Sequence, residues 1–168
     1  MNPISRLLVG LLLFIGVSGM AQNSPKIQIG GGLNYALKLN TSGINGRAYL
    51  RLGDHLRAGP EFTKFLKRTH SGSFQNEDHD AFEINFVVHG MLYTSDFAGV
   101  YGSGGYSFFS ERITKQQTGE SSNQTWHGAK LGAGGFLETG PSTFFLEYHY
   151  ILGGADDHVV TIGYLFGF

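Results

Sequence analysis

The chain has 168 residues, among them 26 glycines and no cysteine, and its net charge is −1. The lack of cysteine excludes disulfides and thiol chemistry. The near-neutral charge argues against nucleic acid as a partner, since proteins that bind nucleic acids carry a basic face. Aromatic residues make up 14% of the chain, which excludes a disordered composition, and the length predicts one domain.

The first 21 residues have the organisation of a cleaved secretory signal peptide. A short head carries one positive charge, Arg6, and an apolar run follows at 7–19. Gly19, Met20 and Ala21 then form the small-x-small pattern of a signal peptidase site. A membrane-anchor helix is the alternative, but the run is shorter than the roughly 20 residues that span a bilayer. We therefore expect export, with 22–168 as the mature domain.

The mature chain alternates apolar and polar residues with the period of two that is typical of β-strands. Eight such segments are predicted, at 26–37, 44–52, 55–65, 81–93, 97–109, 125–137, 143–152 and 158–168. Each is close to the 9–11 residues that a tilted strand needs to cross a membrane. Pro60 lies in the third segment and lacks a backbone donor, so we expect a bulge or locally open pairing there.

The connections between these segments differ systematically in length. Short turns at 53–54, 94–96 and 138–142 alternate with connections at 38–43, 66–80, 110–124 and 153–157. Outer-membrane barrels have short periplasmic turns and longer external loops. With both chain ends in the periplasm, the short turns face the periplasm and the other connections face outward. We therefore predict an all-β fold, an eight-stranded antiparallel up-and-down transmembrane β-barrel.

One face of the predicted strands gathers charged and polar side chains. This lumenal polar network comprises Arg47, Arg51, Arg57, Glu61, Glu83, His89, Lys130, Glu147 and His149. The interior of an eight-stranded barrel is just wide enough for its own side chains, so the charges must meet and pair. Because the basic and acidic groups nearly balance, we expect a plugged barrel and not an open pore.

The final strand ends on aromatic residues. Gly163 is followed by Tyr164, Phe166 and Phe168, and these three side chains share one face of the strand. Such a face suits a strand that meets lipid, with an aromatic ring at the membrane interface. The pattern also resembles the C-terminal signal that the outer-membrane assembly machinery reads. We predict the outer membrane of a Gram-negative bacterium as the location, with membrane lipid, lipopolysaccharide and that machinery as partners.

Five short motifs lie within the predicted strands. They are GGGLNY at 30–35, AGPEF at 58–62, FEI at 82–84, GAGG at 132–135 and LEYHYILG at 146–153. In these motifs the chain resembles the PorT-like barrels, the outer membrane protein β-barrel domain family. The resemblance implies a small eight-stranded outer-membrane barrel. The chain departs from the family at His149, where an arginine often stands, and the secretion or gliding roles of some members do not transfer with these residues.

Catalytic and metal-binding roles have little support in the sequence. Some barrels of this size that modify lipid A use a histidine, a serine and an acid. A serine nucleophile needs a base in contact, but the expected His-x-Ser spacing is missing here, because Ile151 stands two residues after His149. The tracts 78–80 and 156–158 contain aspartate and histidine that could ligate a divalent cation, although mixed charges in a turn usually indicate a solvated loop. We therefore expect no catalytic site, no cofactor and no metal.

The function expected from the sequence is that of a small non-enzymatic outer-membrane barrel. Its role would be structural, or adhesion and docking through the external loops. Two alternatives stay open at this point. One is an outer-membrane lipid-modifying enzyme, and the other is a soluble exported lipocalin-like barrel, in which the apolar face would line a ligand cavity.

Overall fold

The computed structural model describes residues 26–71, 76–153 and 156–168. The predicted signal peptide lies outside the described residues. The described part forms nine strands: β1 (Ile27–Ala36), β2 (Thr41–Arg51), β3 (Leu56–Phe65), β4 (Arg68–Ser71), β5 (Asn76–Thr94), β6 (Ala98–Lys115), β7 (Ser121–Thr139), β8 (Ser142–Ile151) and β9 (Asp157–Gly167). Within these residues no helix is long and apolar enough to cross a membrane.

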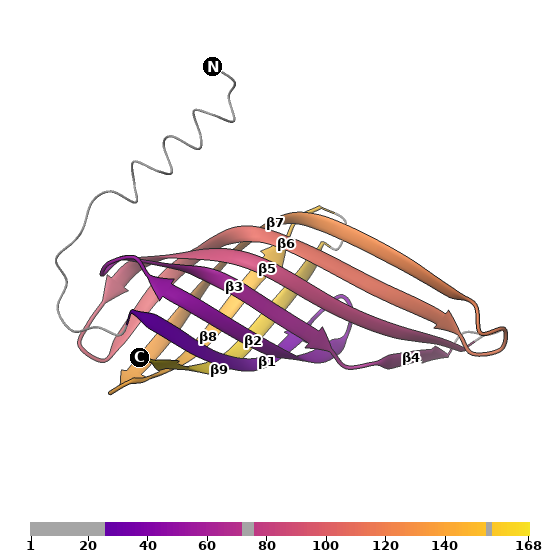
Figure 1. Ribbon diagram of the computed structural model, residues 1–168, viewed down its shortest axis with the longest axis horizontal. Helices are drawn as coiled ribbons and strands as arrows, with labels where there is room; N and C mark the ends of the chain where they lie inside the picture. Colours follow the sequence, from indigo (N-terminus) through magenta and orange to yellow (C-terminus); the bar gives the residue numbers. More distant parts are fainter. Residues whose placement is uncertain (1–25, 72–75, 154–155) are drawn as a thin grey trace, which may run out of the picture.

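Eight of the strands close into an antiparallel barrel (Figure 1). β1 pairs with β2 on one side and with β9 on the other, and β3 pairs with β5 to complete the ring. β4 stands outside the ring as a short partner of β5. The predicted eight-stranded barrel is therefore confirmed.

The β2–β3 ladder is locally open beside Pro60, as the sequence predicts. It contains the pairs Arg47↔Glu61 and Leu50↔Ala58, but the two intervening pairs are absent from it. On its other side, Pro60 remains opposite Phe86 of β5. The missing donor of proline thus interrupts one ladder without shifting its register.

The barrel is apolar outside and polar inside. Ile44 and Ile162 are 62% and 60% exposed, whereas Glu83 and Glu147 are fully buried. Exposed aromatic side chains also lie toward both ends of the wall: Tyr93, Phe97, Phe144, Phe166 and Phe168 at the end of the chain termini, and Tyr35, Phe62, Phe82 and Phe108 at the other. A lipocalin-like barrel would have the opposite arrangement, which argues against the soluble ligand-binding alternative.

The interior is layered along the barrel axis. Near the end distant from the termini, an apolar cluster contains Phe65, Phe109 and Ile151, and the half-buried Trp126 packs against it with its ring 5.6 Å from that of Phe109. A second cluster near the termini contains Tyr49, Tyr101, Phe136, Phe145 and Leu165. Along β8, the buried Glu147 and His149 lie between Phe145 of the second cluster and Ile151 of the first, so apolar side chains flank the charged residues at the centre of the barrel on both sides.

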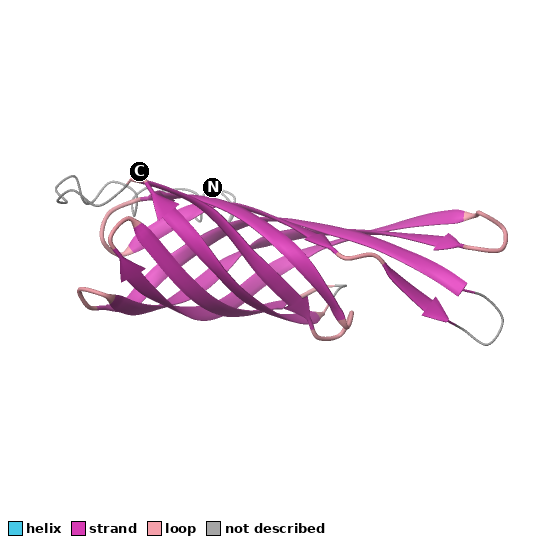
Figure 2. Cartoon of the chain, turned by 90° about the horizontal axis from the view of Figure 1, so that it is seen from below, coloured by secondary structure: helices cyan, strands magenta, loops and turns pink. Residues whose placement is uncertain are grey.

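The predicted loops at 66–80 and 110–124 are wrong over most of their length. They contain β4 and the outer parts of β5, β6 and β7, which continue past the barrel as a protruding sheet of residues 68–71, 76–81, 110–115 and 121–127 (Figure 2). The pairs Glu77↔Lys115 and Thr114↔Ser121 continue the ladders almost to the tips. Both faces of this sheet are largely polar, so the alternation that identifies a barrel strand is missing from its sequence.

Candidate functional site

Glu147 of β8 is the centre of the lumenal polar network. Its carboxylate lies 3.5 Å from a guanidinium nitrogen of Arg47 on β2 and 3.9 Å from Nζ of Lys130 on β7. Two imidazoles also reach it, with His89 Nε2 at 3.5 Å and His149 Nδ1 at 3.3 Å. All five side chains are essentially inaccessible to solvent. The barrel thus surrounds one buried carboxylate with donors from four strands.

Glu61 of β3 is the second acid of this cluster. Lys130 Nζ lies 2.5 Å from Glu61 Oε2, and Arg47 lies 3.5 Å from Glu61 Oε1. The hydroxyl of Tyr49 donates a hydrogen bond to the same carboxylate. Arg47 and Lys130 therefore each bridge Glu61 and Glu147. A buried charge without such partners would cost several kcal/mol, of the order of 3–5 kcal/mol.

Arg57 of β3 extends the network toward the chain termini. Its Nε donates a 2.8 Å hydrogen bond to His89 Nδ1, and its guanidinium lies over the rings of Tyr49 and Tyr101, 5.1 and 4.8 Å from their centroids. Tyr101 in turn donates a 2.9 Å hydrogen bond to Glu147. Because His89 accepts at Nδ1, the proton of its neutral ring lies on Nε2, which faces Glu147.

Two predicted members of the network lie further from this centre. Glu83 is fully buried on β5 and accepts a 3.0 Å hydrogen bond from the hydroxyl of Ser107. Arg51 lies at the end of the barrel near the termini, where it forms a partly exposed 2.9 Å ion pair with Glu138. The sequence places Tyr49 and Tyr101 on the polar face of their strands, but it does not predict that they donate hydrogen bonds to the buried acids.

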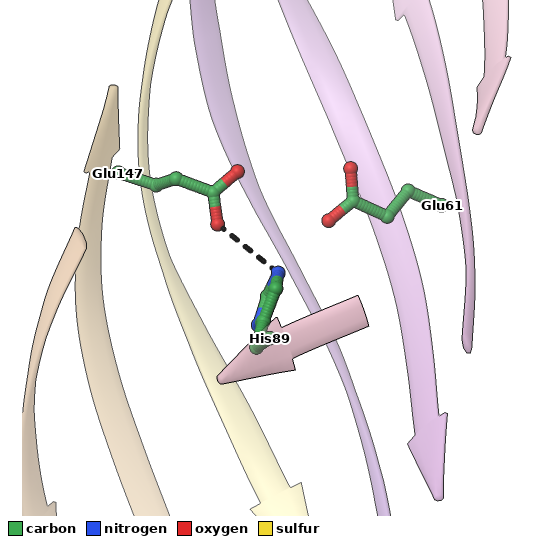
Figure 3. Close-up of side chains that lie close together, drawn as sticks. All are labelled: Glu61, His89 and Glu147. Carbon is green, nitrogen blue, oxygen red and sulfur yellow. Dashed lines mark ion pairs between the residues drawn. The ribbon is translucent and has the colours of Figure 1, made fainter. Parts of the chain in front are cut away.

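Glu61, His89 and Glu147 could in principle hold a metal ion, since one ligand atom from each lies within 4.8 Å of the others (Figure 3). Their atoms, however, already face Arg47, Arg57 and Lys130. A divalent cation would add two positive charges to a cluster whose acids are already balanced by these three bases. The donor set therefore fits a salt-bridge cluster better than a metal site.

The two acidic tracts noted in the sequence do not form converging ligand sets. In 78–80, Asp78 pairs with Lys67 at 3.0 Å, whereas His79 points to the other face of β5 and pairs with Glu111 at 2.7 Å. In 156–158, Asp157 is buried and accepts hydrogen bonds from the backbone of residues 38 and 39. His158 points outward, where its Nδ1 lies 2.5 Å from the hydroxyl of Tyr148.

The position of His149 and Glu147 also bears on the enzymatic alternative. Both side chains are fully buried in the lumen. An enzyme that modifies membrane lipid needs its reacting groups where the lipid can reach them, on the outer wall. The buried pair has no such access, and it instead belongs to the charge cluster that fills the barrel.

Comparison with known proteins places the fold among small outer-membrane barrels. No protein-family model and no curated protein sequence matches the chain. Ail of Yersinia pestis, in complex with the heparin analogue sucrose octasulfate, resembles it with a TM-score of 0.60 and 18% identity over 84% of this chain and 96% of that one. The N-terminal β-barrel domain of Pseudomonas aeruginosa OprF has a TM-score of 0.57 and 16% identity over 88% of this chain and 100% of that one. Neisserial surface protein A has a TM-score of 0.54 and 20% identity over 84% of this chain and 96% of that one. At these identities the likeness concerns the fold alone.

Proposed function

We propose that this protein is a small non-enzymatic outer-membrane β-barrel with a plugged lumen, which docks partners through its protruding sheet. The observation that carries the proposal is the distribution of polarity, which is the inverse of that in a water-soluble protein. Large apolar side chains cover the outer wall of a closed barrel, and the charged ones are buried within it. In water this arrangement would expose a continuous apolar surface, whereas a bilayer solvates it.

The two groups of exposed aromatic side chains support the same location. Outer-membrane barrels carry aromatic girdles at both interfaces, separated by an apolar band. Membrane lipid and lipopolysaccharide are then the partners of the wall, and the location is the outer membrane of a Gram-negative bacterium after export. The motif resemblance to PorT-like barrels is compatible with this assignment and forms part of the proposal.

The interior supports a structural role in place of transport or catalysis. Ion pairs link β2, β3, β7 and β8 across the lumen, and apolar clusters lie on both sides of them. Such a lumen is filled by its own side chains and gives no substrate access to the buried Glu147 or His149. The part of the chain that offers surface to a partner is then the protruding sheet.

The first test is heat modifiability. The full chain is expressed in a Gram-negative host, outer membranes are isolated, and unboiled and boiled samples are compared on a denaturing gel. We expect a membrane-fraction band that shifts on boiling, because a closed barrel resists the detergent until heated. Urea-denatured protein serves as the unshifted control. A band in the soluble periplasmic fraction without a shift would contradict the proposal.

We further propose that Gly163, Tyr164, Phe166 and Phe168 form the C-terminal assembly signal. Phe168 is 69% exposed, and its ring lies 5.1 Å from that of Phe166. An exposed ring contributes little to the folded barrel, so Phe168→Ala should leave refolding of purified protein unchanged but reduce the amount assembled in cells.

Phe97→Ala is the matched control for this variant. Phe97 is similarly exposed, at 66%, at the same end of the barrel, but outside the last strand. The measurement is the heat-shifted fraction in outer membranes and after refolding in detergent. Equal losses from the two variants in cells would show that Phe168 acts only as one more interfacial ring.

A further inference from the structure

The two sides of the protruding sheet differ in how they end. β4 is the outermost strand on one side, and the first part of β7 is outermost on the other. β7 pairs with β6 from Ser121 onward, but with β8 only from Lys130. Among the strands that the structure describes, none pairs with residues 121–127 on the side of β8. We call this stretch the open edge.

The backbone groups that face outward along the open edge follow from strand geometry. The carbonyl of Ala129 accepts a 2.8 Å hydrogen bond from the backbone N–H of Leu152, so Ala129 directs its backbone groups toward β8. Successive residues of a paired strand direct these groups to alternate sides. The residues whose N–H and C=O face the open side are therefore Ser121, Asn123, Thr125 and His127.

The open edge lacks the features that protect an exposed strand from pairing. Proteins blunt such edges with lysine or other charges, with proline, with bulges or by keeping the strand short. β4 follows this rule, because it has only 4 residues and comes directly after the exposed Lys67. The open edge reads Ser-Ser-Asn-Gln-Thr-Trp-His, without lysine, arginine, acid or proline, and the β6–β7 ladder beside it has an unbroken register.

We propose that the open edge binds an extended segment of another polypeptide, which adds to β7 as an antiparallel strand. This rests on the proposed function, since it requires that the protruding sheet lie outside the cell. A row of backbone donors and acceptors at strand spacing is complementary to another strand. A sulfated or phosphorylated polysaccharide would instead need a basic surface, and the open edge contains neither lysine nor arginine.

A second copy in the same membrane does not fit this edge. Two copies related by a two-fold axis along the membrane normal would bring their β7 strands together pointing the same way, not antiparallel. Barrel strands also tilt by about 35–45° from the axis, so the two strands would cross at roughly twice that angle. β7 continues from the barrel into the protruding sheet as one strand. The occupant is therefore a separate polypeptide that approaches from outside.

The test uses the full-length protein in lipid nanodiscs and a set of synthetic peptides of strand length, in which valine or threonine alternates with polar residues. Thr125→Pro removes a backbone donor that faces the open side and leaves all the β6–β7 hydrogen bonds in place. Proline is tolerated at such a position, because it lies on an edge strand with its nitrogen toward solvent. Thr125→Ala is the control, since it changes the side chain and keeps the backbone N–H. We expect Thr125→Pro to weaken peptide binding about tenfold or more, and Thr125→Ala to leave it nearly unchanged.

Two further measurements separate the outcomes. Bound peptide should slow amide hydrogen exchange at 121, 123, 125 and 127, and peptides that are N-methylated at every second residue should lose affinity. If no peptide binds although the barrel shows its heat shift, or if Thr125→Pro binds like the parent chain, the open-edge proposal is overturned. If the parent chain shows no heat shift at all, the proposed function itself fails.

Discussion

Replacing Glu147 by glutamine is expected to lower the free energy of unfolding by about 3–5 kcal/mol, the usual cost of removing one partner from a buried ion pair. Glutamine has nearly the same shape, so the loss reports charge and not packing. In the parent chain Arg47 and Lys130 each lie against two carboxylates, those of Glu61 and Glu147. In the variant the two bases would share the single carboxylate of Glu61. The measurement is equilibrium urea unfolding in lipid vesicles, followed by the fluorescence of Trp126, the single tryptophan of the chain.

Glu138→Gln provides the matched control. Glu138 also pairs with an arginine, Arg51, but the two side chains are 29% and 19% exposed. Partly solvated pairs of this kind contribute about 0–1 kcal/mol. A double variant, Glu147→Gln with Lys130→Met, should recover part of the loss because it restores the balance of charge. If Glu147→Gln were no more destabilising than Glu138→Gln, the buried cluster would not contribute to stability as argued.

The second large effect is expected for Gly30→Val, which should prevent closure of the barrel between β1 and β9. Gly30 lies opposite Leu165 across this seam. A Cβ atom at Gly30 would lie 1.9 Å from the carbonyl oxygen of Tyr164 and 2.8 Å from Cα of Leu165. These are backbone atoms and cannot rotate away, so the cost should exceed the about 1–3 kcal/mol of ordinary overpacking.

The readout is the heat-shifted fraction of refolded protein, which should fall to a minor share in Gly30→Val. Gly46→Val is the control on the neighbouring strand β2, because a Cβ there meets nothing within 4 Å and points to the exposed outer wall. Valine favours strands, so this variant should fold at least as well as the parent chain. A normal heat shift in Gly30→Val would mean that the seam strands approach less closely than the structure indicates.

Much of the barrel follows from alternation along single strands. The parity of Arg47, Glu61 and Glu147 relative to their apolar neighbours predicts that all three point away from the outer wall. Each strand carries its own evidence for this, because side chains of a strand alternate between two faces whatever its neighbours are. Pro60 likewise predicts the open ladder beside it from its missing N–H alone.

The pairings within the network could not be predicted in this way. Which base meets which acid depends on the register between strands and on the stagger with which the sheet closes. The contact of Lys130 with Glu61 joins β7 to β3 across the lumen, and Arg51 leaves the cluster for Glu138. Nothing in the spacing of these residues along the chain encodes either contact.

The protruding sheet is a part of the fold that the sequence pattern does not predict. Its sequence has polar residues on both faces, so the hydrophobic period that predicts a strand is absent. Backbone hydrogen bonds to β6, which is itself paired with β5, extend from ladders already aligned in the barrel and keep residues 121–127 in strand conformation. The open edge exists only because β8 ends at Ile151 while β7 begins at Ser121.

The sequence by itself therefore determined the class of fold, the number of barrel strands and the face to which each side chain belongs, since alternation is a local property of a strand. The tertiary structure decided the partners of the buried charges, the closeness of β1 and β9 at Gly30, and the free side of β7. Those features depend on strand register, barrel closure and unequal strand lengths, which are relations between segments far apart in the chain.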